Sequence, residues 1–168
     1  MAAITHLAVA CFFKKKMKKR IGIIICIIAA YFLDILAIIF TLCKVDFYLY
    51  KLTHIDGSIW SHSLIMALIW SFIFGFGYFL FKRNIVNSIV ILLIVFSHWL
   101  IDLITWPLGC IYKNAPGLFL IWNNKITVGF GLYNSVFLAM LIEFISLIIS
   151  ILILINIYKK RNLKESKQ

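Results

Sequence analysis

Charged residues are scarce in this chain of 168 residues. They make up 14% of it, whereas a soluble domain carries about 25%. Acidic residues are scarcer still, with six Asp and Glu against 17 Lys and Arg. Hydrophobic residues reach 64%, and the mean hydropathy is +1.03. A soluble core could not bury this much apolar surface, so the sequence excludes an ordinary soluble domain and indicates a protein whose main solvent is the bilayer.

Several motifs of other protein classes are also missing. The four cysteines show no paired spacing of the kind that binds zinc. Gly75 and Gly77 stand in no GxGxxG or GK[ST] context, so we expect them to serve helix packing and not phosphate binding. The net charge of +11 comes from short basic clusters beside apolar runs, where they act as topology signals. We therefore expect no nucleic-acid partner.

What the chain does contain is long apolar runs. A transmembrane helix needs about 20 apolar residues, and four runs are long enough: 21–43, 60–81, 84–106 and 130–158. The apolar segment 1–13 would be only ~20 Å long as a helix, so we expect a half-helix that dips into the membrane or lies at its interface. The sequence thus predicts an all-α integral membrane bundle of four transmembrane helices with a short N-terminal half-helix, forming one membrane domain over 1–168.

Basic residues predict the topology of these spans. They follow the first segment, separate the second and third spans at Lys82 and Arg83, and follow the fourth. Four alternating spans place all three clusters and the tail 159–168 on one side, which should be cytoplasmic. The loops 44–59 and 107–129 hold few charges and many aromatics, as expected of an extracytoplasmic interface. We expect a turn at 56–58, an N-cap at Ser58 or Ser61, and solvated side chains at His54 and Asp56.

Three of the six acids nevertheless lie within predicted spans: Asp34, Asp102 and Glu143. Each central charged residue costs roughly 2.5–3.5 kcal/mol on insertion scales, so these groups must be neutralised, paired, metal-bound or hydrated. Counting from the nearest basic anchor at 1.5 Å per residue places them, with His62 and His98, ~21 to ~30 Å into the membrane. Ionisable groups from four helices thus share one layer in its outer half.

The residue types in this layer favour a metal site. His98 and Asp102 are four residues apart and share a helix face. A catalytic zinc site needs about three protein ligands and an open position for water. His62, His98 and Asp102 supply these donors together with Asp34 or with His6, which reaches the cluster only if segment 1–13 folds inward. Glu143 would then be a base, or a partner that contacts the metal ligands without binding the metal. The substrate would be an ester or phosphoester.

Other interpretations use the same groups. A single His–Asp pair inside a membrane can be a structural hydrogen bond. A transporter could use the acids as a proton relay, although the sequence shows neither a broken helix nor an inverted repeat, and four spans is few unless the protein forms a homo-oligomer. A non-catalytic assembly subunit would use buried polar groups to join helices.

Short motifs resemble a known family. They are Thr5-His6, Asp34 in the first span, Ser61-His62-Ser63, Ser97-His98-Trp99-Leu100-Ile101-Asp102, and Gly131-Leu132-Tyr133-Asn134-Ser135 followed by Glu143. Together they resemble a bacterial family of membrane-bound metal-dependent hydrolases of the inner membrane. The resemblance implies a divalent metal such as Zn²⁺, a lipid-like or membrane-proximal substrate, and metal ligands at His6, Asp34, His62, His98 and Asp102.

Overall fold

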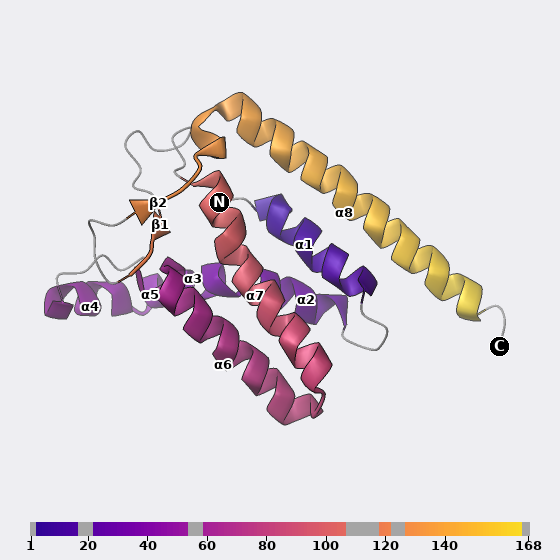
Figure 1. Ribbon diagram of the computed structural model, residues 1–168, viewed down its shortest axis with the longest axis horizontal. Helices are drawn as coiled ribbons and strands as arrows, with labels where there is room; N and C mark the ends of the chain where they lie inside the picture. The colour runs from indigo at the N-terminus through magenta and orange to yellow at the C-terminus, as the bar shows by residue number, and fades with distance from the viewer. Residues whose placement is uncertain (1–2, 17–21, 54–58, 107–117, 122–126, 166–168) are drawn as a thin grey trace.

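The computed structural model describes residues 3–16, 22–53, 59–106, 118–121 and 127–165 (Figure 1). It is mostly helical. In chain order the elements are α1 (Ala3–Lys16), α2 (Ile23–Ala30), α3 (Phe32–Leu42), α4 (Val45–Thr53), α5 (Ile59–His62), α6 (Leu64–Lys82), α7 (Ile85–Thr105), β1 (Leu118–Phe119), β2 (Thr127–Val128), η1 (Leu132–Asn134) and α8 (Val136–Glu165). The antiparallel pair β1–β2, with Leu118 opposite Val128, is a small correction to the all-α prediction. The predicted turn at 56–58, His54 and Asp56 lie outside the described residues.

Among the described residues, three helices are long and apolar enough to cross a membrane: α6, α7 and the part of α8 from Val136 to Lys159. A fourth span exists if α2 and α3 are taken together, but these helices are bent by 58° at Tyr31. The span expected over 21–43 is thus two helices and not one, and its crossing of the membrane stays a prediction. The expected start of the last span is also early, because η1 precedes α8 and the helix begins at Val136.

The tightest helix pair is the hairpin of α6 and α7. Arg83 takes a left-handed conformation with φ of 50°, and the Asn84 side chain then caps α7 by accepting from the Asn87 amide at 3.0 Å. Gly75 lets the two helices approach, because a Cβ there would lie 2.8 Å from the Cβ of Leu92. Its predicted packing role is confirmed. The same prediction for Gly77 is wrong, since no described residue beyond its own stretch of helix comes within 4 Å of a Cβ at that position.

A short helix and a cap precede α6. The side chain of Ser63 accepts from the Met66 amide at 3.3 Å and so forms the N-cap. The expected cap at Ser61 is wrong, because its hydroxyl is bonded to the His62 ring instead, and Ser58 lies outside the described residues. Because Ser63 and not Ser61 caps α6, His62 lies at the last position of α5, immediately before the turn into α6. This position matters for the candidate site.

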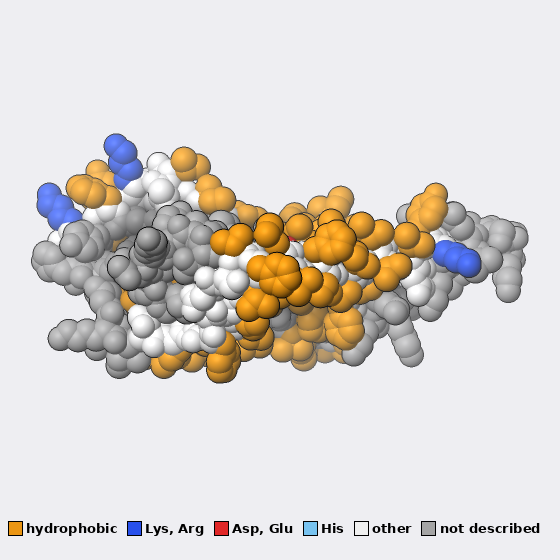
Figure 2. All heavy atoms as spheres, turned by 90° about the horizontal axis from the view of Figure 1, so that it is seen from above, with side chains coloured by type: hydrophobic (Ala, Val, Ile, Leu, Met, Phe, Trp, Pro, Cys, Tyr) orange, Lys and Arg blue, Asp and Glu red, His pale blue; other side chains and the backbone are white. Residues whose placement is uncertain are grey.

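Helix α7 runs through the middle of the molecule, between α6 on one side and α1 and α2 on the other (Figure 1). The core along it consists of small and branched apolar residues: Ala29, Ala30, Leu33, Ala67, Ile91, Ile94 and Val95. Helix α8 packs mainly against α1 and exposes large apolar side chains along most of its length. Hydrophobic side chains gather over the middle of the molecule, and the visible Lys and Arg lie toward its two ends (Figure 2). These apolar helices are consistent with a membrane protein.

Candidate metal centre

Five predicted ligand residues come together in the interior, from four helices. The one-turn spacing of His98 and Asp102 puts both on the buried face of α7, where they are 1% and 3% exposed. Asp34 lies in the first turn of α3 and is 8% exposed, while His6 of α1 is 1% exposed. His62 at the end of α5 is half-buried. The segment that carries His6 therefore does fold inward.

The contacts between these side chains form a continuous ring of alternating nitrogen and oxygen atoms. Asp34 Oδ1 lies 3.4 Å from His62 Nε2 and 3.6 Å from His98 Nε2. Asp102 Oδ2 lies 3.8 Å from His62 Nε2 and 3.3 Å from His98 Nε2. The other oxygen of Asp102, Oδ1, lies 3.5 Å from His6 Nε2. Every imidazole thus faces at least one carboxylate.

These separations are too long for good hydrogen bonds, whose N···O distances are about 2.7–3.2 Å. They do match ligand atoms that share a cation. Two ligands held about 2.1 Å from a tetrahedral Zn²⁺ lie about 3.4 Å apart. In the described part of the chain, His98 Nε2 and both ring nitrogens of His6 are buried without a hydrogen-bond partner. Unsatisfied buried polar atoms are rare, so this arrangement fits a metal ion as the missing partner.

Outer partners orient two of the imidazoles. His98 Nδ1 lies 2.7 Å from the carbonyl oxygen of Ala30, which can only accept, so Nδ1 carries the hydrogen and Nε2 is left to face the carboxylates. His62 Nδ1 lies 2.8 Å from the hydroxyl of Ser61, which can donate or accept, and Nε2 faces the cluster. Metal-binding histidines almost always have such a partner on their other ring nitrogen. Sequence reasoning identified neither partner.

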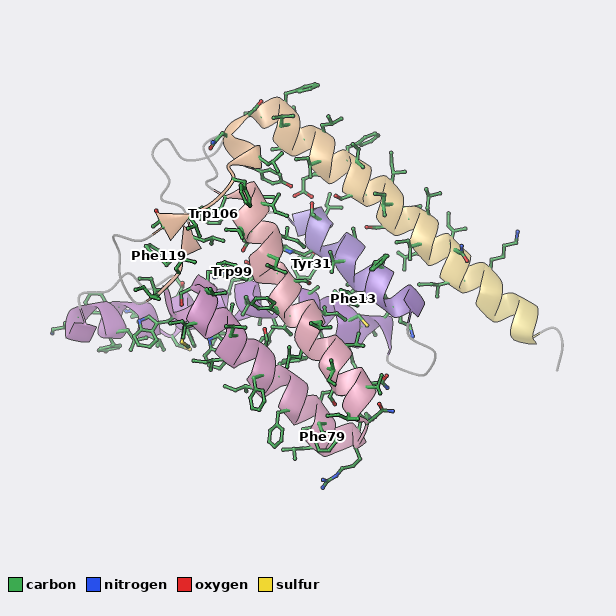
Figure 3. The ribbon with its side chains drawn as sticks, in the orientation of Figure 1. Phe13, Tyr31, Phe79, Trp99, Trp106 and Phe119 are labelled. Atoms are coloured by element: carbon green, nitrogen blue, oxygen red, sulfur yellow. The ribbon has the colours of Figure 1, made fainter. Side chains whose placement is uncertain are left out.

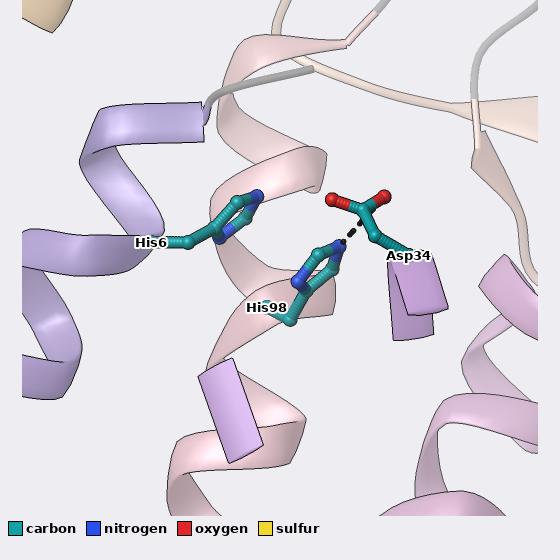
Figure 4. Close-up of side chains that lie close together, drawn as sticks. All are labelled: His6, Asp34 and His98. Carbon is teal, nitrogen blue, oxygen red and sulfur yellow. Dashed lines mark ion pairs between the residues drawn. The ribbon is translucent and has the colours of Figure 1, made fainter. Parts of the chain in front are cut away.

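The rings of His6 and His98 are stacked, with centroids 3.8 Å apart and planes only 4° from parallel. Figure 4 shows these two imidazoles from α1 and α7 side by side, with Asp34 beyond them and its contact to His98 dashed. Two stacked imidazolium rings would repel each other. Neutral rings avoid this repulsion, and neutral rings are also the form that binds metals.

The charge of the cluster also suits a divalent cation. With the imidazoles in the neutral form that binds metals, the two buried carboxylates would leave the cluster a charge of −2, and uncompensated charge in a protein interior is costly. One divalent ion would cancel it. In the part of the chain that the structure describes, two groups of three residues have ligand atoms close enough to hold an ion: His6, Asp34 and His98, and His62, His98 and Asp102. His98 belongs to both groups, and only its Nε2 is free to bind a metal. We therefore expect the two groups to form one site that holds one ion.

Glu143 lies on α8 and contacts a different part of the chain. Its Oε2 accepts from the backbone amides of Ile4 and Thr5, at 2.8 and 3.2 Å, and its Oε1 accepts from the Tyr133 hydroxyl at 2.8 Å. These bonds tie α8 and η1 to the first turn of α1. Glu143 therefore contacts Thr5, the residue before His6. Of its two predicted roles, a base or a partner of the metal ligands, these contacts agree with the second.

An open hollow of about 680 Å³ lies beside Trp99, the residue after His98. Its lining includes Trp99 and Leu103 of α7, Val128 of β2 and Phe130 just after that strand. Figure 3 shows Trp99 and Phe119 on the side of α7 that faces the strands. The indole N–H of Trp99 donates to the carbonyl oxygen of His62 at 2.9 Å, so a residue that lines the hollow is bonded to the backbone of a cluster residue.

Comparison of the chain with known protein families, curated proteins and solved structures gives no match.

Proposed function

We propose that the protein is an integral membrane metalloprotein that binds one divalent cation, most simply Zn²⁺, at the His/Asp cluster. The observation that carries the proposal is the ring of nitrogen and oxygen contacts at 3.3–3.8 Å, in which buried imidazole nitrogens have no hydrogen-bond partner. His98 is the central ligand, because both possible ligand groups include it. Asp34, Asp102, His62 and His6 complete the set.

The chemistry that fits best is hydrolysis of an ester or phosphoester in a lipid-like or membrane-proximal substrate. A bound Zn²⁺ would supply a water of near-neutral pKa. Asp34 and Asp102 would hold the cation and compensate its charge, and Ser61 and Ala30 would keep the imidazoles in the ligating orientation. The apolar part of the substrate would occupy the hollow beside Trp99, whose walls are mainly hydrophobic. The motif resemblance to membrane-bound metal-dependent hydrolases supports the same assignment.

The placement in the membrane is part of this proposal. We propose four spans, with the bent pair α2–α3 as the first, in a bacterial inner membrane. Helix α1 would enter the bilayer as a half-helix. The basic ends of α1, α6 and α8 and the C-terminal tail would lie in the cytoplasm, since Lys and Arg favour that side. This orientation places α4 and the β1–β2 pair at the extracytoplasmic surface.

The break between α2 and α3 favours a second candidate function, that of a small transporter. Substrate and ion sites of transporters are often built at discontinuous helices whose free carbonyls face the pathway. Here the helix bends by 58°, and the Ala30 carbonyl at the break binds His98 of the cluster. Flux into proteoliposomes that depends on Asp34, without hydrolysis of any added ester, would favour this function over hydrolysis.

Metal content tests the main proposal. We expect protein purified in mild detergent to contain about one equivalent of a transition metal, measured by inductively coupled plasma mass spectrometry. A four-ligand zinc site binds with roughly 12 kcal/mol, or about 3 kcal/mol per ligand, so His98→Ala should weaken binding by about a hundredfold or more. Ser88→Ala is the matched control, because Ser88 also lies buried on α7 but its hydroxyl bonds only to the carbonyl of Asn84. Equal metal content in the two variants, or none in the wild type, would contradict the proposal.

A further inference from the structure

We infer that Glu143 is a positioning residue: it anchors the first turn of α1 on α8 and thereby holds His6 in the cluster. Its acceptor oxygens, and not its ability to take up a proton, carry this role. The anchoring itself is independent of the proposed function, whereas its consequence for metal affinity rests on it.

The first turn of α1 needs an outside acceptor. The leading amides of a helix have no partner within the helix, and a Ser, Thr, Asp or Asn before it commonly supplies one. The residue before α1 is Ala2, which has no such side chain. Glu143 supplies it from 139 residues away by accepting from the amide of Ile4, and the same oxygen accepts from the next amide. A carboxylate at this end is also favoured by the helix dipole.

A second set of contacts fixes the rotation of α1. The hydroxyl of Thr5 lies 3.2 Å from that of Ser146 and 3.5 Å from that of Tyr133. Ser146 is three residues after Glu143, so both project from one face of α8. Because His6 follows Thr5 directly, the contacts of Thr5 also direct the His6 ring toward His98.

The tyrosine keeps the carboxylate in place from its other side. Burial raises the pKa of the Tyr133 hydroxyl, and the neighbouring Glu143 carboxylate raises it too. The hydroxyl therefore stays protonated and donates to Glu143 Oε1. Both carboxylate oxygens are thus engaged in holding α1 and η1.

The alternative role, a general base, makes the opposite prediction for one variant. In Glu143→Gln the amide oxygen can still accept from the backbone of α1, and the amide nitrogen can donate to the Tyr133 oxygen. Glutamine cannot accept a proton as a base does. The positioning role therefore predicts that Glu143→Gln behaves nearly as the wild type, whereas Glu143→Ala does not.

A metal-free measurement decides the anchoring. Cys11 of α1 is fully buried, so its alkylation by N-ethylmaleimide in detergent reports loss of α1 packing. Because hydrogen bonds to a charged group are among the stronger ones in proteins, we expect Glu143→Ala to raise the alkylation rate of Cys11 by about tenfold or more. The alkylation rate of Cys11 in Glu143→Gln should stay within about threefold of the wild-type rate, a smaller change than the loss of one hydrogen bond to a charged group would cause. Peptide mass spectrometry would distinguish Cys11 from the other cysteines.

Ser150→Ala is the control, because its hydroxyl bonds only to the Ser146 carbonyl within α8. If Glu143→Ala does not fold, Glu143→Asp, which shortens the reach to α1, should show the same increase. Two results would overturn the inference. One is a wild-type rate of Cys11 alkylation in both Glu143→Ala and Glu143→Asp, and the other is a rate in Glu143→Gln as high as that in Glu143→Ala.

Metal affinity tests the link to His6. We expect Glu143→Ala to weaken metal binding as much as His6→Ala does, and the double variant to bind no more weakly than His6→Ala alone. A further loss in the His6→Ala background would overturn the link, because a general structural defect would act whether or not His6 is present. If the wild type binds no metal, the proposed function fails, and the Cys11 measurement still decides whether Glu143 anchors α1.

Discussion

Single atoms outside the ligand set decide how the imidazoles face the cluster. The Ala30 carbonyl orients His98, and no substitution can remove a backbone oxygen. The Ser61 hydroxyl orients His62 and can be removed. Orientation of a ligand by such a partner raises its basicity and lowers the entropy lost on binding, so the partner contributes to affinity without touching the ion.

Removal of this hydroxyl should weaken metal binding without abolishing it. Because loss of an outer partner typically costs about 10–100-fold in metal affinity, Ser61→Ala should raise the Kd by this factor, while the stoichiometry at saturating metal stays that of the wild type. Competition with a chromophoric chelator would measure both. Ser97→Ala is a matched control, since its hydroxyl bonds to the Ile94 carbonyl of its own helix. Equal Kd values for the two serine variants would count against an orienting role for Ser61.

The sequence predicts ligands more readily than it predicts their partners. The His98–Asp102 pair follows from helical spacing alone, and counting residues from basic anchors puts Asp34 and His62 in its layer. The partner of Glu143 is an amide 139 residues away, and no pattern in the sequence indicates it. Contacts of this kind depend on how whole helices pack, which local periodicity does not encode.

At the scale of elements, the hydrophobic runs predict where helices lie but not where they bend. No proline or glycine interrupts the run at Tyr31, so the expected single helix has no local signal against it. The structure supplies a physical cause, because helices also kink where a side chain bonds into the backbone ladder, and His98 does so at Ala30. The bend then allows Asp34, four residues after Ala30, to face the cluster.

Two glycines on α6 offer a matched test of helix packing. A methyl group at Gly75 would press on Leu92 at 2.8 Å, and such overpacking costs about 1–3 kcal/mol. Alanine also gains about 1 kcal/mol of helix propensity over glycine. We therefore expect Gly75→Ala to lower the free energy of unfolding and Gly77→Ala, which points into open space, to leave it unchanged or raise it. Unfolding by dodecyl sulfate in mixed micelles measures the difference, and equal stabilities would contradict close packing at Gly75.

At the scale of the whole molecule, the basic ends of three elements lie together, although α4, at the other end of the molecule, also carries Lys51 (Figure 1). The end of α1, the turn between α6 and α7 and the end of α8 point toward the same end of the bundle (Figure 1). Lysines or arginines stand at or beside each of them in the sequence. The cluster lies toward the opposite end, near the start of α1 and the end of α7. A metal centre in this place would open to the extracytoplasmic side if the basic end faces the cytoplasm.

Cysteine labelling tests this orientation in intact cells. Cys43, at the end of α3, is exposed and lies in the region that should face outward, whereas Lys82 is exposed at the basic end. We expect a membrane-impermeant maleimide added outside to label Cys43 in spheroplasts. A cysteine introduced by Lys82→Cys should react only after the membrane is permeabilised, because Lys and Arg are retained on the cytoplasmic side. Labelling in the reverse order would invert the topology and place the metal centre, with its adjoining hollow, on the cytoplasmic side.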